Sequence, residues 1–243
     1  MSTSLKVFVA GGAGVIGRRL IPQLVGREYR VTATTRSAGK AAELEKLGAT
    51  PAVVDVFDAP ALARAVEKAQ PDVIIHQPTD LGLLHEPGQG TEALARNARI
   101  RTDGTRNLVA AAVAAQVRRF VAQSIVWVYA PGREPHVEDD PLDVTARGNR
   151  AITVGGVVAL ESAVLGAPSM QGLVLRYGYF YGPGANEKPA GSPGVHVDAA
   201  ARAAALAVER GAPGIYNVCE PGPTTSNEKA RRGLGWDPNY RLG

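Results

Sequence analysis

The sequence predicts an α/β fold in which a doubly wound parallel sheet is covered by helices on both faces. Three observations predict it. Short apolar, β-rich runs alternate with helix-like stretches, a glycine-rich turn follows the first strand, and 243 residues suffice for one such domain with a small lobe. With 45% hydrophobic and 21% charged residues, the composition is that of an ordinary globular protein.

In the first half of the chain, each β-rich run is followed by a stretch with helical spacing of apolar residues. The run LKVFVA leads directly into the glycine-rich GGAGVIG and then into the first helix. We expect strands at 5–10, 29–34, 50–55 and 72–76, and helices at 15–26, 38–47 and 59–69.

In the second half, a loop rich in proline and glycine over 77–90 precedes a long helical segment over 93–116. Further strands are expected at 119–124 and 173–176, separated by a polar loop at 131–149 and a helix that ends near Leu165. An alanine-rich helix is expected at 199–210. We predict a dinucleotide-binding domain over 1–176 and a small substrate lobe over 177–243, interleaved with the end of the sheet.

Charge and cysteine content narrow the function classes. The net charge of +4 comes from scattered arginines without a basic run, which argues against a nucleic-acid partner. The single cysteine, Cys219, excludes an intrachain disulfide and fits a reducing cytoplasm. No apolar stretch is long enough to span a bilayer and no signal-peptide pattern opens the chain, so we expect a cytoplasmic protein without a membrane partner.

The glycines Gly11, Gly14 and Gly17 lie between the first strand and the first helix. Glycine there permits a tight turn, close approach of backbone N–H groups to a pyrophosphate, and close packing of helix on strand. The helix N-terminus then faces the phosphates favourably. The alternative interpretation is a merely flexible turn, but the position of the triplet favours a dinucleotide site.

After the second strand, where NAD-specific sites place an acidic residue, the chain has Arg36 and Ser37, with Lys40 nearby. A guanidinium attracts a 2′-phosphate, which predicts a preference for NADP(H), with NAD(H) as the other possibility. Alternatively, Arg36 stacks on the adenine or points into solvent. Asp55, at the end of the third strand, is a candidate to hydrogen-bond the adenine or else to cap the following helix.

Ordered motifs along almost the whole chain resemble the extended branch of the short-chain dehydrogenase/reductase superfamily, the NAD-dependent epimerase/dehydratase family. They include GGAGVIG at 11–17, DGTRNLVAAA at 103–112, RFVAQSIVWVYA at 119–130, LRYGYFYGPG at 175–184 and VHVDAAA at 195–201. The resemblance implies a Rossmann-type fold and a cofactor site comprising Gly11, Gly14, Val15, Ile16, Gly17, Arg36, Ser37, Asp55, Val56, Gln77 and Pro78.

The resemblance also implies a Tyr-x-x-x-Lys pair with a Ser or Thr as the acid–base relay, and here the chain departs from the family. Aligned on Glu161, the tyrosine and lysine positions hold Thr153 and Val157, and the hydroxyl position four residues before Tyr129 holds Ile125. We therefore expect a different proton donor or no family reaction.

The candidate substitutes for the missing relay lie next to these positions or on loops at the strand ends. Our catalytic candidates are Ser124, adjacent to the hydroxyl position, and Tyr177, after the sixth strand. Further side chains there are Tyr179, Tyr181, His76, Asp80, His85 and His136, each of which is more simply explained as structural. Together with His196, the histidines show no paired ligand spacing, so we expect no metal site.

Two family segments are short, one at 185–194 and one between Glu220 and Ser226. Either the substrate lobe is truncated, which would leave the site open to water, or the sequence omits internal segments. We expect an NADP(H)-dependent oxidoreductase, or an epimerase or dehydratase, acting on a small carbonyl or hydroxyl compound. The alternatives are a catalytically degenerate regulatory or structural protein and a non-redox lyase or cyclase. Alanine-rich faces of two long helices permit a homodimer, or equally packing within one subunit.

Overall fold

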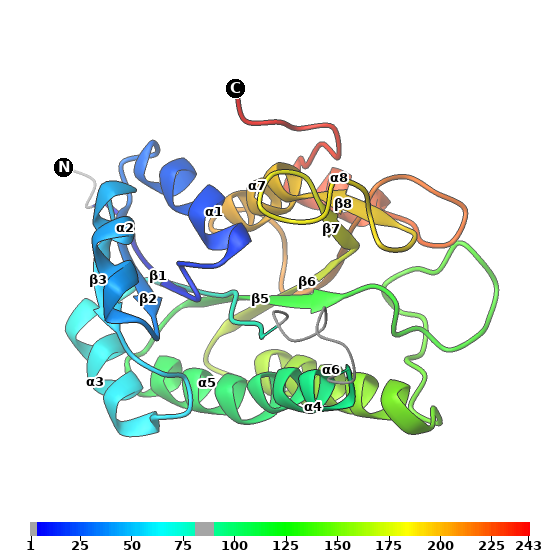
Figure 1. Cartoon of the computed structure of the whole chain (residues 1–243), viewed down its shortest axis with the longest axis horizontal. Coiled ribbons are helices and arrows are strands. Elements are labelled where there is room, and N and C mark those ends of the chain that lie inside the picture. Colours follow the sequence, from blue (N-terminus) through cyan, green and yellow to red (C-terminus); the bar gives the residue numbers. More distant parts are fainter. Residues whose placement is uncertain (1–3, 81–89) are drawn as a thin grey trace.

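Seven strands form a parallel sheet between two layers of helices in the computed structural model, which describes residues 4–80 and 90–243 (Figure 1). The strand order is β3-β2-β1-β4-β5-β6-β9, and all neighbours are parallel. The predicted α/β class is therefore confirmed. The strands are β1 (Lys6–Ala10), β2 (Arg30–Thr35), β3 (Thr50–Val53), β4 (Val73–His76), β5 (Arg119–Ile125), β6 (Gln171–Tyr177) and β9 (Gly214–Val218).

The helices divide into two layers, which Figure 1 shows above and below the sheet. Two apolar clusters, one on each face, hold these layers to the strands. The upper layer contains α1 (Val15–Val25), α2 (Ala41–Lys46), α7 (Val197–Ala207) and α8 (Glu228–Leu234). The lower layer contains α3 (Ala59–Ala69), α4 (Gly90–Arg99), α5 (Thr105–Ala114) and α6 (Gly148–Leu165).

The central strands read as continuous apolar runs because both of their faces are covered. Every residue of β4 and β5 is buried, as burial between two helix layers requires. The chain runs outward from β1 to β3 and then returns to β4 on the other side of β1. This reversal creates a switch point beside β1 and β4, where open α/β sheets bind ligands at the carboxyl ends of their strands.

The helical segment expected over 93–116 is divided by one widened turn. A π-helical turn at Ile100–Gly104 separates α4 from α5, and the Thr105 hydroxyl lies 3.5 Å from the Ile100 carbonyl oxygen. Such turns often occur at functional sites in helices. This one places Ile100 on the wall of the pocket described below.

The third strand is shorter than the sequence predicts, and the difference moves one candidate residue. β3 ends at Val53, so Asp55 lies in the turn after the strand rather than at its end. There the Asp55 carbonyl oxygen accepts the Asp58 N–H at 3.1 Å, which turns the chain toward α3.

The C-terminal segment contains α7, the alanine-rich helix expected at 199–210, and further elements that the sequence did not predict. These are α8 in the upper layer, β9 in the main sheet, and β7 (Tyr179–Tyr181), which pairs in parallel with β8 (Gly194–His196) in a separate small sheet. β7 and β8 have three residues each, too few for a periodic signal. The division at residue 176 remains a prediction.

Candidate functional site

The glycine-rich loop between β1 and α1 has no room for side chains. Gly11 has φ +77°, and a Cβ there would lie 2.8 Å from the backbone of Gln77 and of Pro78. A Cβ on Gly17 would lie 2.4 Å from the Gly12 carbonyl oxygen. Only glycine fits both positions, because one needs a left-handed backbone and the other a close contact with backbone.

The N-terminus of α1 opens toward this loop without a side-chain cap. Gly14 is the N-cap residue in an extended conformation, and its N–H donates to the Gly11 carbonyl oxygen at 3.1 Å. The N–H groups of the first turn of a helix have no intrahelical acceptor, so they can bind an anion. The loop and helix end therefore fit the pyrophosphate of a dinucleotide.

A pocket of about 360 Å³ lies against this loop at the carboxyl ends of β1, β2 and β4. Seven of the predicted cofactor residues line it. These are Gly11, Gly14, Arg36, Ser37, Val56, Gln77 and Pro78. Lys40, noted beside Arg36 in the sequence, lines it as well.

The other four predicted cofactor residues are not on the pocket wall. Val15 and Ile16 begin α1, where Ile16 packs into the apolar cluster between the upper helix layer and the sheet, and Gly17 closes the loop against Gly12. Asp55 uses one carboxylate oxygen to accept the Phe57 N–H at 2.9 Å, while Asp58 rather than Asp55 caps α3 through the Ala61 N–H. Asp55 therefore does not cap the helix, and its role as an adenine ligand stays a prediction.

Several wall residues escaped sequence analysis because they carry no chemical signal of their own. Thr34 and Thr35 end β2, whereas the sequence predicts Thr34 as the last strand residue and Thr35 as the first residue beyond the strand. Their place at the carboxyl edge beside the glycine loop is the signal that identifies them. The remaining unpredicted wall residues are Ala13, Val54, Phe57, Thr79 and Ile100.

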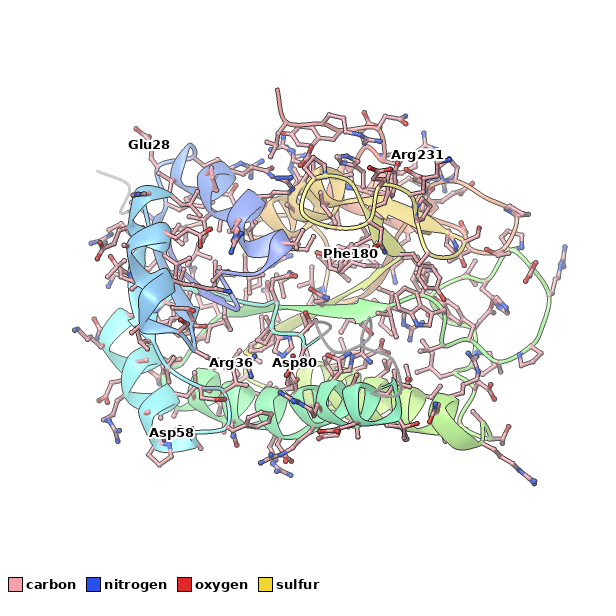
Figure 2. All side chains as sticks on the ribbon, viewed as in Figure 1. Glu28, Arg36, Asp58, Asp80, Phe180 and Arg231 are labelled. Atoms are coloured by element: carbon pink, nitrogen blue, oxygen red, sulfur yellow. The ribbon has the colours of Figure 1, made fainter. Side chains whose placement is uncertain are left out.

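Arg36 lies at the pocket rim with about half of its side chain exposed. Its Nη1 atom is 3.8 Å from a carboxylate oxygen of Asp80, which also accepts a hydrogen bond from Arg96 at 2.9 Å. Figure 2 shows Arg36 and Asp80 close together beside the strand ends. Asp80 thus has two cationic neighbours. Because Arg36 is half-exposed and its ion-pair distance to Asp80 is long, its guanidinium is accessible to an anion in the pocket.

Gln77 supplies a polar group at the end of β4. The side chain is 5% exposed, and neither its amide nitrogen nor its amide oxygen has a hydrogen-bond partner in the described structure. A buried amide without partners costs free energy, so it favours a ligand that completes its hydrogen bonds. Because Gln77 lines the pocket, it fits a dinucleotide group placed over β4.

The preceding residue, His76, is buried and faces α5. Its Nε2 atom lies 3.1 Å from the Thr105 hydroxyl oxygen. Burial, with a smaller contribution from the Arg101 charge, lowers the pKa of His76 to about 4. The imidazole is therefore neutral at physiological pH, and its contact with Thr105 links the end of β4 to α5.

Ser124, the first catalytic candidate, belongs to a buried polar network. Its hydroxyl donates to Glu161 at 2.8 Å, and the Arg176 guanidinium donates to both oxygens of Glu161 at 2.9 and 2.7 Å. Ser124 and Arg176 are 0% and 2% exposed. This network ties α6 to β5 and β6, and it gives the serine hydroxyl a structural partner.

Tyr177, the second catalytic candidate, is likewise enclosed. Its side chain is 0% exposed and its hydroxyl donates to the Ala200 carbonyl oxygen at 3.2 Å. Burial raises the pKa of Tyr177 well above its usual range, which opposes loss of its proton. The geometry thus favours a structural role for both candidates.

Two of the positions aligned with the family relay belong to a buried apolar cluster. Ile125, Val157 and Val154 are buried together in one small cluster with Val128, against which Trp127 packs. The Thr153 hydroxyl donates to the Asn149 carbonyl oxygen within its own helix at 3.3 Å. The side chains at these positions therefore supply no acid or base.

The remaining polar candidates have structural partners where they can be described. His136 lies 3.0 Å from Asp140 and stacks on Tyr129, while His196 accepts the Asp198 N–H at 3.2 Å. His85 falls outside the described residues. Within 4–80 and 90–243, no cluster of three His, Cys, Asp or Glu side chains is arranged to hold a metal ion. No helix in these ranges is long and apolar enough to cross a membrane.

Comparison with solved structures shows the same fold. A dTDP-glucose 4,6-dehydratase from Streptomyces venezuelae, solved with NAD, is 20% identical with a TM-score of 0.78 over 97% of this chain and 92% of that one. A UDP-glucose 4-epimerase from Thermotoga maritima, solved with UDP-glucose, is 19% identical with a TM-score of 0.74 over 97% and 94%. At this identity the likeness concerns the fold alone.

Sequence comparison gives nearer relatives. A 3-diazoavenalumate denitrifying reductase from a Streptomyces species is 39% identical over 97% of this chain and 80% of its own length. Its 258-residue alignment exceeds the 243 residues here, so it carries segments that this chain lacks. A 3-beta-hydroxysteroid dehydrogenase from Mycolicibacterium neoaurum is 32% identical over 70% of this chain, which spans 45% of that protein.

These relatives are enzymes, which favours the oxidoreductase or epimerase prediction over a degenerate regulatory protein. The glycine loop, the uncapped helix end and the pocket fit an NAD-type dinucleotide. Residues 7–202 match the profile of the NAD dependent epimerase/dehydratase family, which confirms the resemblance read from the sequence. This chain therefore belongs to the NAD dependent epimerase/dehydratase family, as an NAD(P)-binding enzyme of the oxidoreductase and epimerase type.

Proposed function

We propose that this chain is an NADP(H)-dependent reductase that transfers hydride to an acceptor needing no proton from the protein, and that the acceptor is a diazo compound in its diazonium form. The observation that carries the proposal is the buried apolar cluster that contains Ile125 and Val157, which stand where the family resemblance places a hydroxyl and an ammonium group. A carbonyl acceptor needs a proton as hydride arrives, and these side chains do not deliver one.

The acceptor class follows from electron balance. A reduced nicotinamide held by the pocket residues would supply hydride, so that a new C–H bond forms as the C–N bond breaks and its electron pair leaves with dinitrogen: R–N₂⁺ + H⁻ → R–H + N₂. No proton enters this balance. The Streptomyces relative, at 39% identity, has a name that describes denitrifying reduction of a diazo compound, which supports the same class here.

The preference for NADP(H) rests on charge at the pocket rim. Arg36, Ser37 and Lys40 line the pocket next to the end of β2, and no carboxylate is found among the described lining residues. A guanidinium and an ammonium favour a 2′-phosphate, whereas a carboxylate there favours the free ribose hydroxyls. The cofactor-binding roles of the other predicted residues are part of this proposal. In it, Gly11 and Gly14 contact the phosphates, and Gln77 contacts the part of the dinucleotide that lies over the end of β4.

The chain's remaining contribution is exclusion of water and orientation. Val154, Val157 and Ile125 form a buried apolar cluster where the family reaction needs polar groups, and a cationic acceptor bound beside this cluster would be less hydrated than in bulk solvent. Ser124 and Tyr177, held by Glu161 and Ala200, keep the neighbouring strand ends in place. Removal of water protects a diazonium ion from hydrolysis before hydride arrives.

The test uses purified protein, an arenediazonium salt and NADPH deuterated at C4. We expect one N₂ released per NADPH oxidised, with deuterium at the carbon that carried nitrogen. We also expect kcat to stay within about twofold between pH 6 and 8, because no group of the protein titrates in the hydride step. Product without deuterium, or oxidation of NADPH by simple carbonyl compounds but not by diazonium salts, would overturn the proposal.

We also propose a homodimer formed through the outer face of α6. Apart from Arg150 and the buried Glu161, this helix carries no charged residue, although Gly155, Ser162 and Leu165 are exposed. A surface helix normally has a charged outer face, so an apolar one indicates a partner. Light scattering should give a dimer that Ser162→Arg dissociates, and a wild-type monomer at micromolar concentration would refute it. The cytoplasmic location stays a prediction.

A further inference from the structure

Two aromatic side chains lie stacked where β5 and β6 end. The ring centroids of Trp127 and Tyr179 are 4.0 Å apart with an interplanar angle of 13°. The strand register pairs Ile125 with Tyr177, so the stacked residues follow two positions beyond these partners on both strands. Both side chains are partly exposed, unlike the wholly buried Tyr177.

The strand order brings this pair to the same edge of the sheet as the pocket. The pocket with Arg36 lies over β2, and Gln77 lies over β4, so a dinucleotide that begins at Arg36 extends toward β5. The next strands in the sheet are β5 and β6, and Trp127 and Tyr179 follow two residues after the last residue of each. In sheets of this type ligands bind along that edge.

The stacked pair is held in place before any ligand binds. Arg150 donates to the carbonyl oxygens of Trp127 and Tyr129, each at 2.9 Å. A Cβ on Gly191 would lie 2.6 Å from the Tyr179 ring, so the loop before β8 backs the tyrosine. Trp127 also rests on the apolar cluster that contains Val157. A fixed aromatic surface loses little entropy when a ligand stacks on it.

We infer that Trp127 and Tyr179 form an aromatic platform that stacks on the ring of the hydride acceptor, so that this enzyme acts on planar aromatic substrates. This inference rests on the proposed function and names its substrate class. General chemistry agrees with it, because alkanediazonium ions lose N₂ spontaneously, whereas arenediazonium ions persist long enough to be reduced by an enzyme. Aromatic rings gain stacking energy beyond the area that they bury.

The test measures binding rather than turnover. Calorimetric titrations compare 4-hydroxybenzoate with its ring-saturated counterpart, 4-hydroxycyclohexanecarboxylate, with and without saturating NADP⁺. Both probes carry the same carboxylate and hydroxyl, so only the ring differs. We expect the aromatic probe to bind roughly tenfold more tightly, the upper range for an aromatic pair. Equal affinities, or no binding of either probe, would overturn the inference.

The variants assign this preference to the platform. Trp127→Leu should bring the affinities for the two probes within about twofold of each other. NADPH binding, measured by fluorescence, shows whether this variant is folded. If it is not folded, Tyr179→Leu takes its place. The matched control is Trp236→Phe, since Trp236, the chain's other tryptophan, is 2% exposed and donates to Ala199. A preference that survives in both leucine variants would refute the platform. Failure of wild type to bind NADPH would instead overturn the proposed function, while the titrations without NADP⁺ still decide the inference.

Discussion

Replacing Arg36 with alanine should weaken binding of NADPH and leave binding of NADH almost unchanged. A hydrogen bond to a charged group contributes about 1.5–3 kcal/mol. The Arg36 side chain is 53% exposed and lies 3.8 Å from Asp80, which competes with a phosphate for the guanidinium. The lower end of that range therefore applies, and a loss of about 1.5 kcal/mol corresponds to a roughly tenfold increase in Kd.

The assay is titration of nicotinamide fluorescence with NADPH and with NADH. Arg232→Ala is the matched control, because Arg232 is an exposed arginine paired with Glu228 on α8. We expect the NADPH effect to shrink with added salt, since the contact is exposed. An equal loss for both nucleotides would refute the phosphate contact and show that Arg36 stacks on the adenine. No loss for either would show that it points into solvent.

Three further predictions test the loop, the buried histidine and the catalytic candidates. Gly11→Ala should lower the free energy of unfolding by about 2 kcal/mol in denaturant titrations and abolish NADPH binding, because φ is +77° and the new Cβ would collide with the backbone. The control Gly222→Ala should have neither effect, because no atom lies near the position of its Cβ. His76 is neutral in the folded protein because burial lowers its pKa to about 4, whereas in the unfolded chain it protonates near pH 6.5. The free energy of unfolding should therefore be largest above pH 6.5 and fall by about 3 kcal/mol toward pH 4. A free energy of unfolding that does not change over this range would contradict the burial of His76. Ser124→Ala and Tyr177→Phe should lower Tm while leaving kcat within about threefold, whereas a hundredfold loss of kcat would identify a proton donor.

Much of the site was predictable because its signals are local. The glycine spacing and the basic residues after β2 can be read within a few neighbouring positions, and the structure places Gly11, Gly14, Arg36 and Ser37 on one pocket. Asp55 was misplaced because strand ends depend on single hydrogen bonds. Here β3 ends at Val53, and Asp55 lies in the following turn, where its carboxylate accepts the Phe57 N–H.

The catalytic candidates show what local sequence patterns do not predict, which is the burial of a side chain. A hydroxyl beside a family position is visible in sequence, but its accessibility depends on partners far away in the chain. Glu161 reaches Ser124 from α6, and the Ala200 carbonyl reaches Tyr177 from α7. These contacts arise only when the helix layers pack on the sheet.

The sequence by itself determined the alternating α/β order, the position of the dinucleotide loop and the absence of a Tyr-x-x-x-Lys motif, because each is a matter of residue type at short spacing. Only the tertiary structure decided that Ile125 and Val157 share a buried apolar cluster, that Gln77 has no partner in the described structure, and that Trp127 stacks on Tyr179. The physical reason is strand register: parallel pairing of β5 with β6 brings distant segments to the same edge of the sheet, and no local pattern encodes which side chains meet there.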